Sequence, residues 1–267
     1  MLKVLIATLP VLFPMFFISG LLIELNFLRL RGVKILSHFT GFPTSARMIN
    51  ILYTRGEITK QQAFSALTQT SVVSPAFIIL SLGLSMYGDI RIGIFIVVAQ
   101  IIGALLNGRA WLGAGIAFKR FAPALRYASG DTCADTQLLK STPAPPRDKA
   151  EIISKTLHSS VKSTIKVGVL IAFFYVLTGF FGTFVASFLE LTTGVYRVET
   201  LLGANIWRVI IPTAIVSFGG LSVAMQGQIF LRPIGIKLWL YLTYKATQMI
   251  FSCVIAAILY FSILPLW

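Results

Sequence analysis

Two short stretches place helix-breaking residues and small hydroxyls inside an otherwise strongly apolar chain, at residues 41–47 (GFPTSAR) and 217–223 (SFGGLSV). Within a bilayer, unpaired backbone N–H and C=O groups are costly unless protein or a water-filled cavity receives them. Helix interruptions at corresponding places in two halves of a chain indicate the binding site of a transporter. We therefore expect these stretches to contact a small polar solute.

The first stretch has the groups that an anion site needs. Gly41 and Pro43 permit a tight turn into a helix, and Thr44 or Ser45 would cap its first turn. Free N–H groups at a helix start attract anions, and the Arg47 guanidinium matches a carboxylate bidentately. The sequence predicts a carboxylate site here, unless Arg47 instead reaches the cytoplasmic headgroups as a positive-inside charge.

The second stretch offers close backbone approach and an amide. Gly219 and Gly220 leave room for a ligand or a neighbouring backbone after Ser217. Ser222 and Gln226 lie one helical turn apart on the same face, and the glutamine can both donate to and accept from a polar ring. The alternative is that these small residues pack helices together.

Further hydroxyls enter an apolar run beside a proline. Thr70, Ser71 and Ser74 directly precede Pro75 and the segment AFIIL. They either line a substrate path or satisfy the carbonyl group that the proline leaves free.

Ionisable residues inside apolar runs are functional candidates by default. Glu190 follows a long uncharged run and Glu24 lies near the end of the first one, so either acid could couple transport to a proton or cation, or lie in water at a span end. Lys245 either faces the protein interior or snorkels, with its ammonium group extended to the membrane surface. Thr193 with Gly194 begins a broken segment in the second half, as Thr40 with Gly41 does in the first.

The composition indicates a membrane protein, because 56% of the 267 residues are hydrophobic and 12% are charged, whereas soluble domains have about 25% charged residues. Several runs carry no Asp, Glu, Lys or Arg: residues 4–23, 61–88, 92–108, 167–189, 209–231 and 246–267. A spanning helix needs about 20 apolar residues, so we predict an all-α polytopic fold in contact with a lipid bilayer. The net charge of +14 fits basic loops on the cytoplasmic side better than a nucleic-acid partner.

A polar, basic linker at residues 119–162 divides the chain into a first membrane half, 1–118, and a second, 163–267. Its positive charge predicts a cytoplasmic location. Residues 149–166 are expected to begin as an amphipathic helix on the membrane surface. Counting crossings outward from the linker gives about three per half, with opposite starting sides, which is an inverted-topology arrangement with broken or re-entrant helices.

No enzyme signature accompanies these features. His38 and His158 lack metal-ligand spacing, and no nucleophile elbow or phosphate loop is present, so we expect no enzyme activity, cofactor or metal. Thr59 is expected to cap the helix that follows it. Two alternatives to a carrier stay open: a non-transporting membrane scaffold in sporulation or envelope assembly, and a subunit that functions only as a homo-oligomer or with a partner.

The chain resembles the YlbJ family of sporulation integral membrane proteins, also called SpoVV, which carry nucleoside-recognition gate domains. The resemblance covers most of the chain outside the linker and rests on segments that occur in the family's order: residues 41–47, 56–63, 70–71, 75–78, 190–194 and 217–223 with Gln226. The SFGGLSV segment is its most specific part.

This resemblance implies a polytopic carrier built from gate-like repeats. The family is implicated in moving dipicolinic acid out of the mother cell across the outer forespore membrane of spore formers. Dipicolinate has a ring flanked by two carboxylates, which would suit Arg47, the nearby hydroxyls and Gln226. Gate domains are also similar to parts of concentrative nucleoside transporters, so a nucleoside-like solute is the alternative substrate class. Ser45 stands where the family usually has glycine, and Arg47 where it often has lysine.

Overall fold

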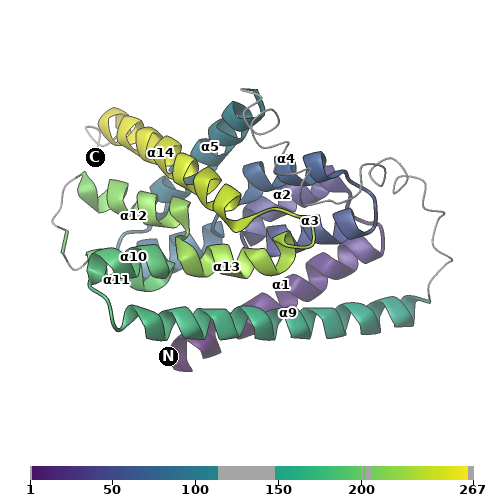
Figure 1. Ribbon diagram of the computed structural model, residues 1–267. Helices are drawn as coiled ribbons and strands as arrows, with labels where there is room; N and C mark the ends of the chain where they lie inside the picture. Colours follow the sequence, from purple (N-terminus) through teal and green to yellow (C-terminus); the bar gives the residue numbers. More distant parts are fainter. Residues whose placement is uncertain (1, 114–147, 200, 203–205, 264–267) are drawn as a thin grey trace.

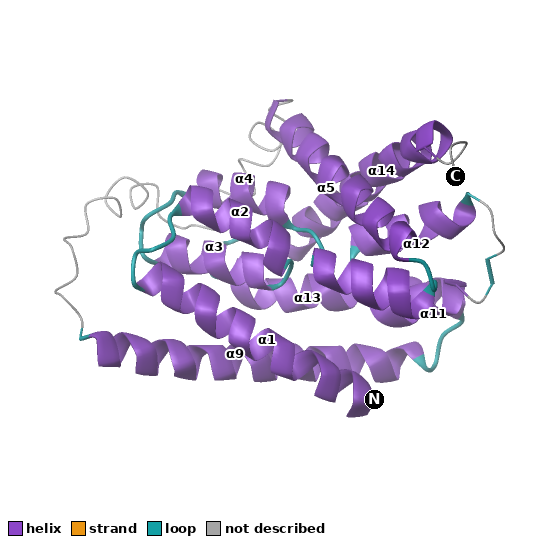
Figure 2. Cartoon of the chain, turned by 180° about the vertical axis from the view of Figure 1, so that it is seen from behind, coloured by secondary structure: helices purple, strands orange, loops and turns teal. Residues whose placement is uncertain are grey.

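The computed structural model describes residues 2–113, 148–199, 201–202 and 206–263, and these residues form helices and loops without a strand (Figure 2). Four described helical segments are long and apolar enough to cross a membrane: Ile90–Trp111, Lys149–Thr178, Trp207–Leu231 and Leu238–Ser262. The predicted all-α polytopic fold is confirmed, and the architecture is that of a multi-pass membrane protein.

The first half begins with the long helix α1 and ends with the long helix α5. Between them lie a hairpin of two short helices, α2 and α3, and a helix that is broken between α4 and the π-helix η1. The elements are α1 (Leu2–Glu24), α2 (Leu30–Thr40), α3 (Thr44–Thr54), α4 (Lys60–Thr70), η1 (Phe77–Met86) and α5 (Ile90–Gly113).

The second half repeats this order. Its elements are α9 (Lys149–Thr178), the hairpin α10 (Thr183–Leu189) and α11 (Leu191–Glu199), the broken pair α12 (Trp207–Phe218) and α13 (Gly220–Leu231), and α14 (Leu238–Ile263). The corresponding helices α1 and α9 lie side by side and run antiparallel, while α5 and α14 pack against each other at a crossing (Figure 1). Equal element order with opposite direction is the pattern of an inverted repeat.

In the first half, the tip of the hairpin packs against the break in the neighbouring helix. Gly41 has φ 71°, and an added Cβ there would lie 2.8 Å from Cα of Ser74. The Phe42 amide donates to the Val72 carbonyl over 2.8 Å. Backbone groups that the two interruptions free are therefore paired with each other, as a low-dielectric surrounding requires.

The second half uses the same contact between a hairpin tip and a helix break. Gly219 and Gly220 have φ 82° and 75°. An added Cβ on Gly220 would lie 3.4 Å from both the Leu189 carbonyl oxygen and the Leu191 amide nitrogen. The break between α12 and α13 thus lies against the α10–α11 turn at Glu190.

The start of the second half differs from the sequence-based expectation. We expected a surface helix at residues 149–166 followed by a separate span, but α9 runs unbroken over 30 residues from Lys149 to Thr178. A helix of this length extends about 45 Å, so its basic end and its apolar end belong to one rigid rod. The expected linker boundary at residue 162 falls inside this helix, and residues 119–147 lie outside the described residues.

At the starts of α4 and α5, a side chain accepts a hydrogen bond from a free backbone amide. Thr59 caps α4 in a capping box with Gln62, so the predicted cap is confirmed. Asp89 accepts the Arg91 amide at the start of α5 over 2.9 Å. The hydrogen bond from the Arg91 side chain lowers the pKa of the Asp89 carboxyl below its usual value.

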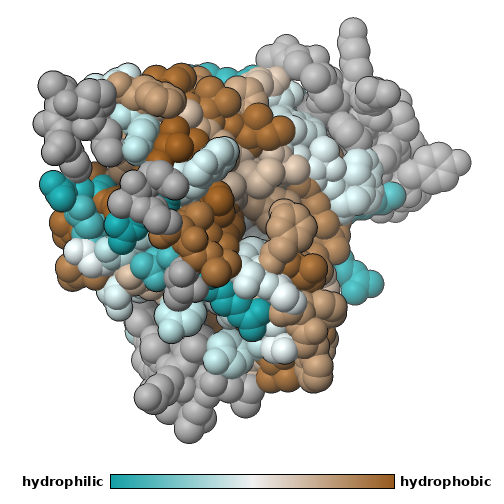
Figure 3. Space-filling view, turned by 90° about the vertical axis from the view of Figure 1, so that its left-hand side faces the viewer, coloured by the Kyte–Doolittle hydropathy of each residue, from teal (hydrophilic) through white to brown (hydrophobic). Residues whose placement is uncertain are grey.

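Many large apolar side chains are exposed, and on the face in Figure 3 they form hydrophobic patches between hydrophilic ones. On α9, Val161, Ile165, Val169, Phe173 and Val176 are exposed at spacings of three and four residues, so they form one stripe. An exposed apolar stripe of this length is unfavourable in water and favourable against acyl chains. This surface is the one that meets the lipid bilayer.

The crossing of α5 and α14 depends on a close approach at Gly103. An added Cβ there would lie 2.7 Å from Cα of Ser252 and 2.8 Å from its amide nitrogen. We expect Gly103→Val to lower the free energy of unfolding by about 1–3 kcal/mol, because overpacking forces the two helices apart. Thermal unfolding in detergent measures this change.

The control for that prediction is Gly182→Val at the start of α10. Gly182 is extended, with φ −66° and ψ 167°, and an added Cβ there meets nothing within 4 Å. Gly182 is the N-cap of α10, so we expect this variant to lower the free energy of unfolding by about 1 kcal/mol or less, from the poorer cap alone. Equal melting temperatures for the two variants would contradict the packing argument.

Candidate functional site

Arg47 places a buried cation between three helices. Its side chain comes from α3 and is only 3% exposed. Nη1 donates to the Phe16 carbonyl of α1, and Nη2 donates to Ser159 and Ser160 of α9 over 3.2 and 3.1 Å. Among the described residues, no carboxylate forms an ion pair with this guanidinium. Its direct hydrogen-bond partners are neutral oxygens, its Cζ lies 5.4 Å from the centre of the Phe16 ring, and the Glu24 carboxylate acts on it from beyond ion-pair distance.

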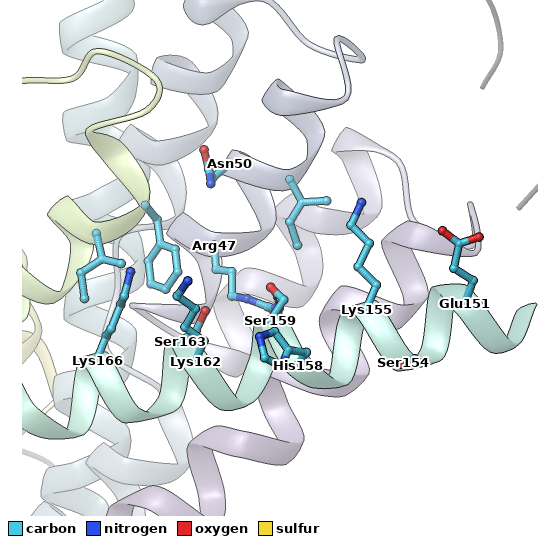
Figure 4. Close-up of a pocket in the computed structure, with 13 residues that line it drawn as sticks. Arg47, Asn50, Glu151, Ser154, Lys155, His158, Ser159, Lys162, Ser163 and Lys166 are labelled. Atoms are coloured by element: carbon cyan, nitrogen blue, oxygen red, sulfur yellow. Dashed lines mark hydrogen bonds between the residues drawn. The ribbon is translucent and has the colours of Figure 1, made fainter. Parts of the chain in front are cut away.

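Arg47 lines a cavity of about 810 Å³ between α3, α9 and α13 (Figure 4). The lining combines basic, hydroxyl and apolar side chains: Arg47, Asn50, Ile51, Glu151, Ser154, Lys155, His158, Ser159, Lys162, Ser163, Lys166, Ile229 and Phe230. This volume lies in the range of small-molecule sites, about 300–1,000 Å³.

The cavity is basic because of the spacing of lysines along α9. Lys155, Lys162 and Lys166 are separated by seven and four residues, so they share one face of the helix. All three are exposed at the open side of the cavity, whereas Arg47 is buried. Glu151 is the one carboxylate in the lining. This arrangement attracts an anion and offers it a desolvated guanidinium.

Asn50 adds a polar group whose bonding is incomplete. It lines the cavity one turn after Arg47, and its buried Oδ1 has no partner within the described part of the chain. An amide can present either an acceptor or donors to a ligand.

The structure places the rest of the first predicted stretch away from the cavity lining. Thr44 and Ser45 are buried, and Pro43 is the N-cap of α3, without a side-chain capping bond. The predicted cap by Thr44 or Ser45 is wrong. The Ser45 amide donates to Gly41 and the Arg47 amide to Pro43, over 3.1 and 3.2 Å, because the turn itself supplies main-chain acceptors.

The second predicted stretch lies on the neighbouring helix without lining the cavity. Gln226 donates to Ser222 over 3.1 Å, so these two side chains satisfy each other. The buried Ser217 hydroxyl has no partner in the described structure. Gly227 lies against the Phe42 ring, which joins α13 to the tip of the first hairpin. It is the C-terminal part of α13, at Phe230, that reaches the cavity.

Glu190 caps a helix. It is 7% exposed, and its two carboxylate oxygens accept the Thr192 and Thr193 amides over 3.0 and 2.7 Å. The start of α11 thus neutralises part of the charge through its free N–H groups and its dipole. Thr193 contributes its backbone amide to this cap.

The hydroxyls before Pro75 satisfy backbone carbonyls. Thr70 donates to Ala66 over 2.9 Å and Ser71 to Leu67 over 2.8 Å, while Ser74 donates across to Phe39 over 3.2 Å. None of these hydroxyls reaches the Ser71 carbonyl that Pro75 leaves free, so the alternative that they satisfy it is wrong; Lys245 donates to this carbonyl instead. The substrate-lining role of the segment stays a prediction.

Lys245 faces the interior, which decides between the two alternatives for this residue. It is 2% exposed, and Nζ donates to the Ser71 carbonyl over 2.7 Å and to Gln248 Oε1 over 2.8 Å. Arg109, by contrast, is exposed on α5.

Sequence reasoning missed a set of polar side chains buried between the two halves. Gln100 and Asn107 of α5 donate to the Val216 and Tyr244 carbonyls over 3.3 and 3.2 Å. Both side chains are fully buried. Their spacing of seven residues within an uncharged run is a signal that could have identified a polar inward face.

Comparisons with protein-family models, curated proteins and solved structures found no match.

We expect Glu190→Ala to lower the free energy of unfolding by about 1–2 kcal/mol, because it removes a helix cap. The Thr192 and Thr193 amides should exchange with deuterium faster, whereas Glu190→Gln should retain part of the protection through its remaining carbonyl oxygen. Hydrogen exchange in detergent measures both effects.

Glu199→Ala at the opposite end of α11 is the matched control. A carboxylate near a helix C-terminus is electrostatically unfavourable, so its removal should not speed exchange at Thr192. Unchanged protection of the Thr192 and Thr193 amides in Glu190→Ala would show that the cap does not stabilise α11.

Proposed function

We propose that this protein is a membrane carrier for a small organic anion, and that the cavity beside Arg47 is its binding site. The observation that carries this proposal is the buried Arg47 guanidinium, which forms no direct ion pair with a carboxylate among the described residues and lines a cavity that also holds three lysines. Burying an unpaired charge is costly, and a bound carboxylate would offset that cost.

The helix interruptions support a carrier over a scaffold. Each half pairs a hairpin tip with a broken helix, and the halves run in opposite directions. Broken helices at membrane depth are typical of transporters, whose two repeats move relative to each other around a site. A scaffold has no need of buried cations within its helices.

The charge of the cavity favours a carboxylate-bearing solute over a neutral nucleoside. A dicarboxylate could contact Arg47 with one group and an α9 lysine with the other. Dipicolinate is therefore the first substrate to test, in line with the resemblance to the YlbJ family. We place the basic linker and the cavity opening at the cytoplasmic side of the cell membrane, or of the outer forespore membrane in a spore former.

Arg47→Gln should reduce dipicolinate uptake into proteoliposomes by about thirtyfold or more, because losing one partner of a buried charged hydrogen bond costs about 2 kcal/mol or more. Arg47→Lys should fall between this variant and the wild type, since it keeps the charge and loses the planar fork. Uptake of radiolabelled dipicolinate, with uridine as the nucleoside comparison, measures the effect.

Arg109→Gln provides the matched control, because Arg109 is an exposed arginine on α5 outside the cavity. Its uptake should equal that of the wild type. Size-exclusion profiles establish that each variant is folded. Wild-type uptake in a folded Arg47→Gln variant would remove the site assignment, and uridine uptake without dipicolinate uptake would overturn the anion specificity.

A further inference from the structure

A second buried cation lies outside the Arg47 cavity. Lys245 does not belong to that lining, and it is the one charged residue within the described helix α14. A lysine can bury its stem and extend its ammonium group to water, yet this ammonium group points into the protein. Its position therefore requires an explanation from its partners.

The first partner is the end of a broken helix. Ser71 is the C-cap of α4, and Pro75 has no N–H with which to satisfy the Ser71 carbonyl four residues earlier. Lys245 Nζ donates to this carbonyl over 2.7 Å. A helix C-terminus carries partial negative charge, so the ammonium group lies where a cation is favoured.

The other broken helix passes the stem of the same lysine. An added Cβ on Gly219 would lie 3.8 Å from Cε of Lys245. One side chain thus touches the interruption of the first half and that of the second. In transporters with broken helices, free carbonyls and half-helix C-terminal ends coordinate the coupling Na⁺ or H⁺.

No carboxylate among the described residues forms an ion pair with Lys245. Glu190, in the turn against the α12–α13 break, accepts the Thr192 and Thr193 amides instead.

The nearby titratable groups of α14 are the Tyr241 and Tyr244 phenols, and the Tyr244 hydroxyl donates to the Thr68 carbonyl. On α5 the charged residues are Arg91 and Arg109, both exposed near the helix ends.

The remaining packed helices add no acid. On α12, Arg208 is directed to the Tyr87 carbonyl over 3.2 Å. The sequence of α13, GLSVAMQGQIFL, has no titratable side chain. The partners of Lys245 are therefore neutral oxygens, those of Ser71 and of Gln248.

From this geometry, and resting on the proposed carrier function, we infer that Lys245 is the proton-carrying group that couples transport to a proton gradient. The ammonium group links α14 to the Ser71 carbonyl at the C-terminal end of α4, and it takes the role that a bound metal cation has in other transporters. When it transfers one proton to a water molecule, the neutral amine loses its charge-assisted bond to Ser71, and the contact between the broken helices loosens. Uptake of one proton from water on the other side restores the contact.

The test compares two assays of the full-length protein in proteoliposomes, with dipicolinate as the probe. Counterflow exchanges labelled for unlabelled dipicolinate and needs no net proton movement. Net uptake under an imposed gradient, acidic outside, needs the proton. We expect Lys245→Met to retain counterflow and to lose the stimulation by the gradient, because its apolar stem fills the site but carries no proton.

Two further variants sharpen this test. Lys245→Arg keeps a permanent charge, so the contact at Ser71 cannot loosen, and this variant should lose both counterflow and the stimulation. Lys237→Met, the same substitution at an exposed position just before α14, should behave as the wild type in both assays. Protein-free liposomes correct for passive entry of the probe.

The outcomes separate this inference from the carrier proposal. Gradient-stimulated uptake in Lys245→Met, or loss of counterflow in a folded Lys245→Met protein, would overturn the proton-carrying role. Wild-type counterflow together with net uptake that does not respond to the gradient would overturn it as well, while leaving the carrier intact. Absence of counterflow in the wild type would instead overturn the proposed function itself.

Discussion

The structure depends on one constraint: inside a bilayer, each backbone N–H and C=O group freed by a broken helix must find a partner within the protein. The partners come from the neighbouring interruption or from a side chain placed for the purpose. Phe42 bonds to Val72, and Lys245 bonds to the carbonyl that Pro75 leaves free at Ser71. The α11 amides are satisfied by Glu190. Each hairpin tip must therefore lie against a break, and this contact determines how the short helices pack.

The same requirement that buried polar groups find partners within the protein explains the surroundings of the two buried cations. The direct hydrogen-bond partners of Arg47 and Lys245 are carbonyl, hydroxyl or amide oxygens, and neither cation forms an ion pair with a carboxylate in the described part of the chain. Neutral partners hold a charge less tightly than an ion pair does, so a ligand or a proton can compete for it. The environments differ, because Arg47 lines a cavity bordered by exposed lysines and Lys245 is enclosed between helices. The first suits exchange of an anion with water, and the second suits exchange of a proton.

Local signals in the sequence predicted the fold well. Uncharged runs identified the apolar helices, and Gly41 and Gly219 marked the breaks. The partners of polar side chains were less predictable, because a hydroxyl or amide satisfies a backbone group, a neighbour or a ligand with equal ease. Ser222 and Gln226 share a helix face as expected, yet they bond to each other. Likewise, a charged amphipathic segment looks the same whether it lies on the membrane or extends a span, as α9 does.

The common order of the two halves makes their difference in packing informative. By position in that order, the cavity between α3, α9 and α13 corresponds to the region between α11, α1 and η1. In that second region, Ile78 and Leu82 of η1 share an apolar cluster with Leu191 and Val195 of α11. The region between α3, α9 and α13 is thus an open basic cavity, whereas in the corresponding region of the other half α11 and η1 pack together through apolar contacts. An inverted repeat can exchange these two packings between its halves, which would open the opposite side of the membrane. Under the proposed function, the structure therefore corresponds to one end state of alternating access.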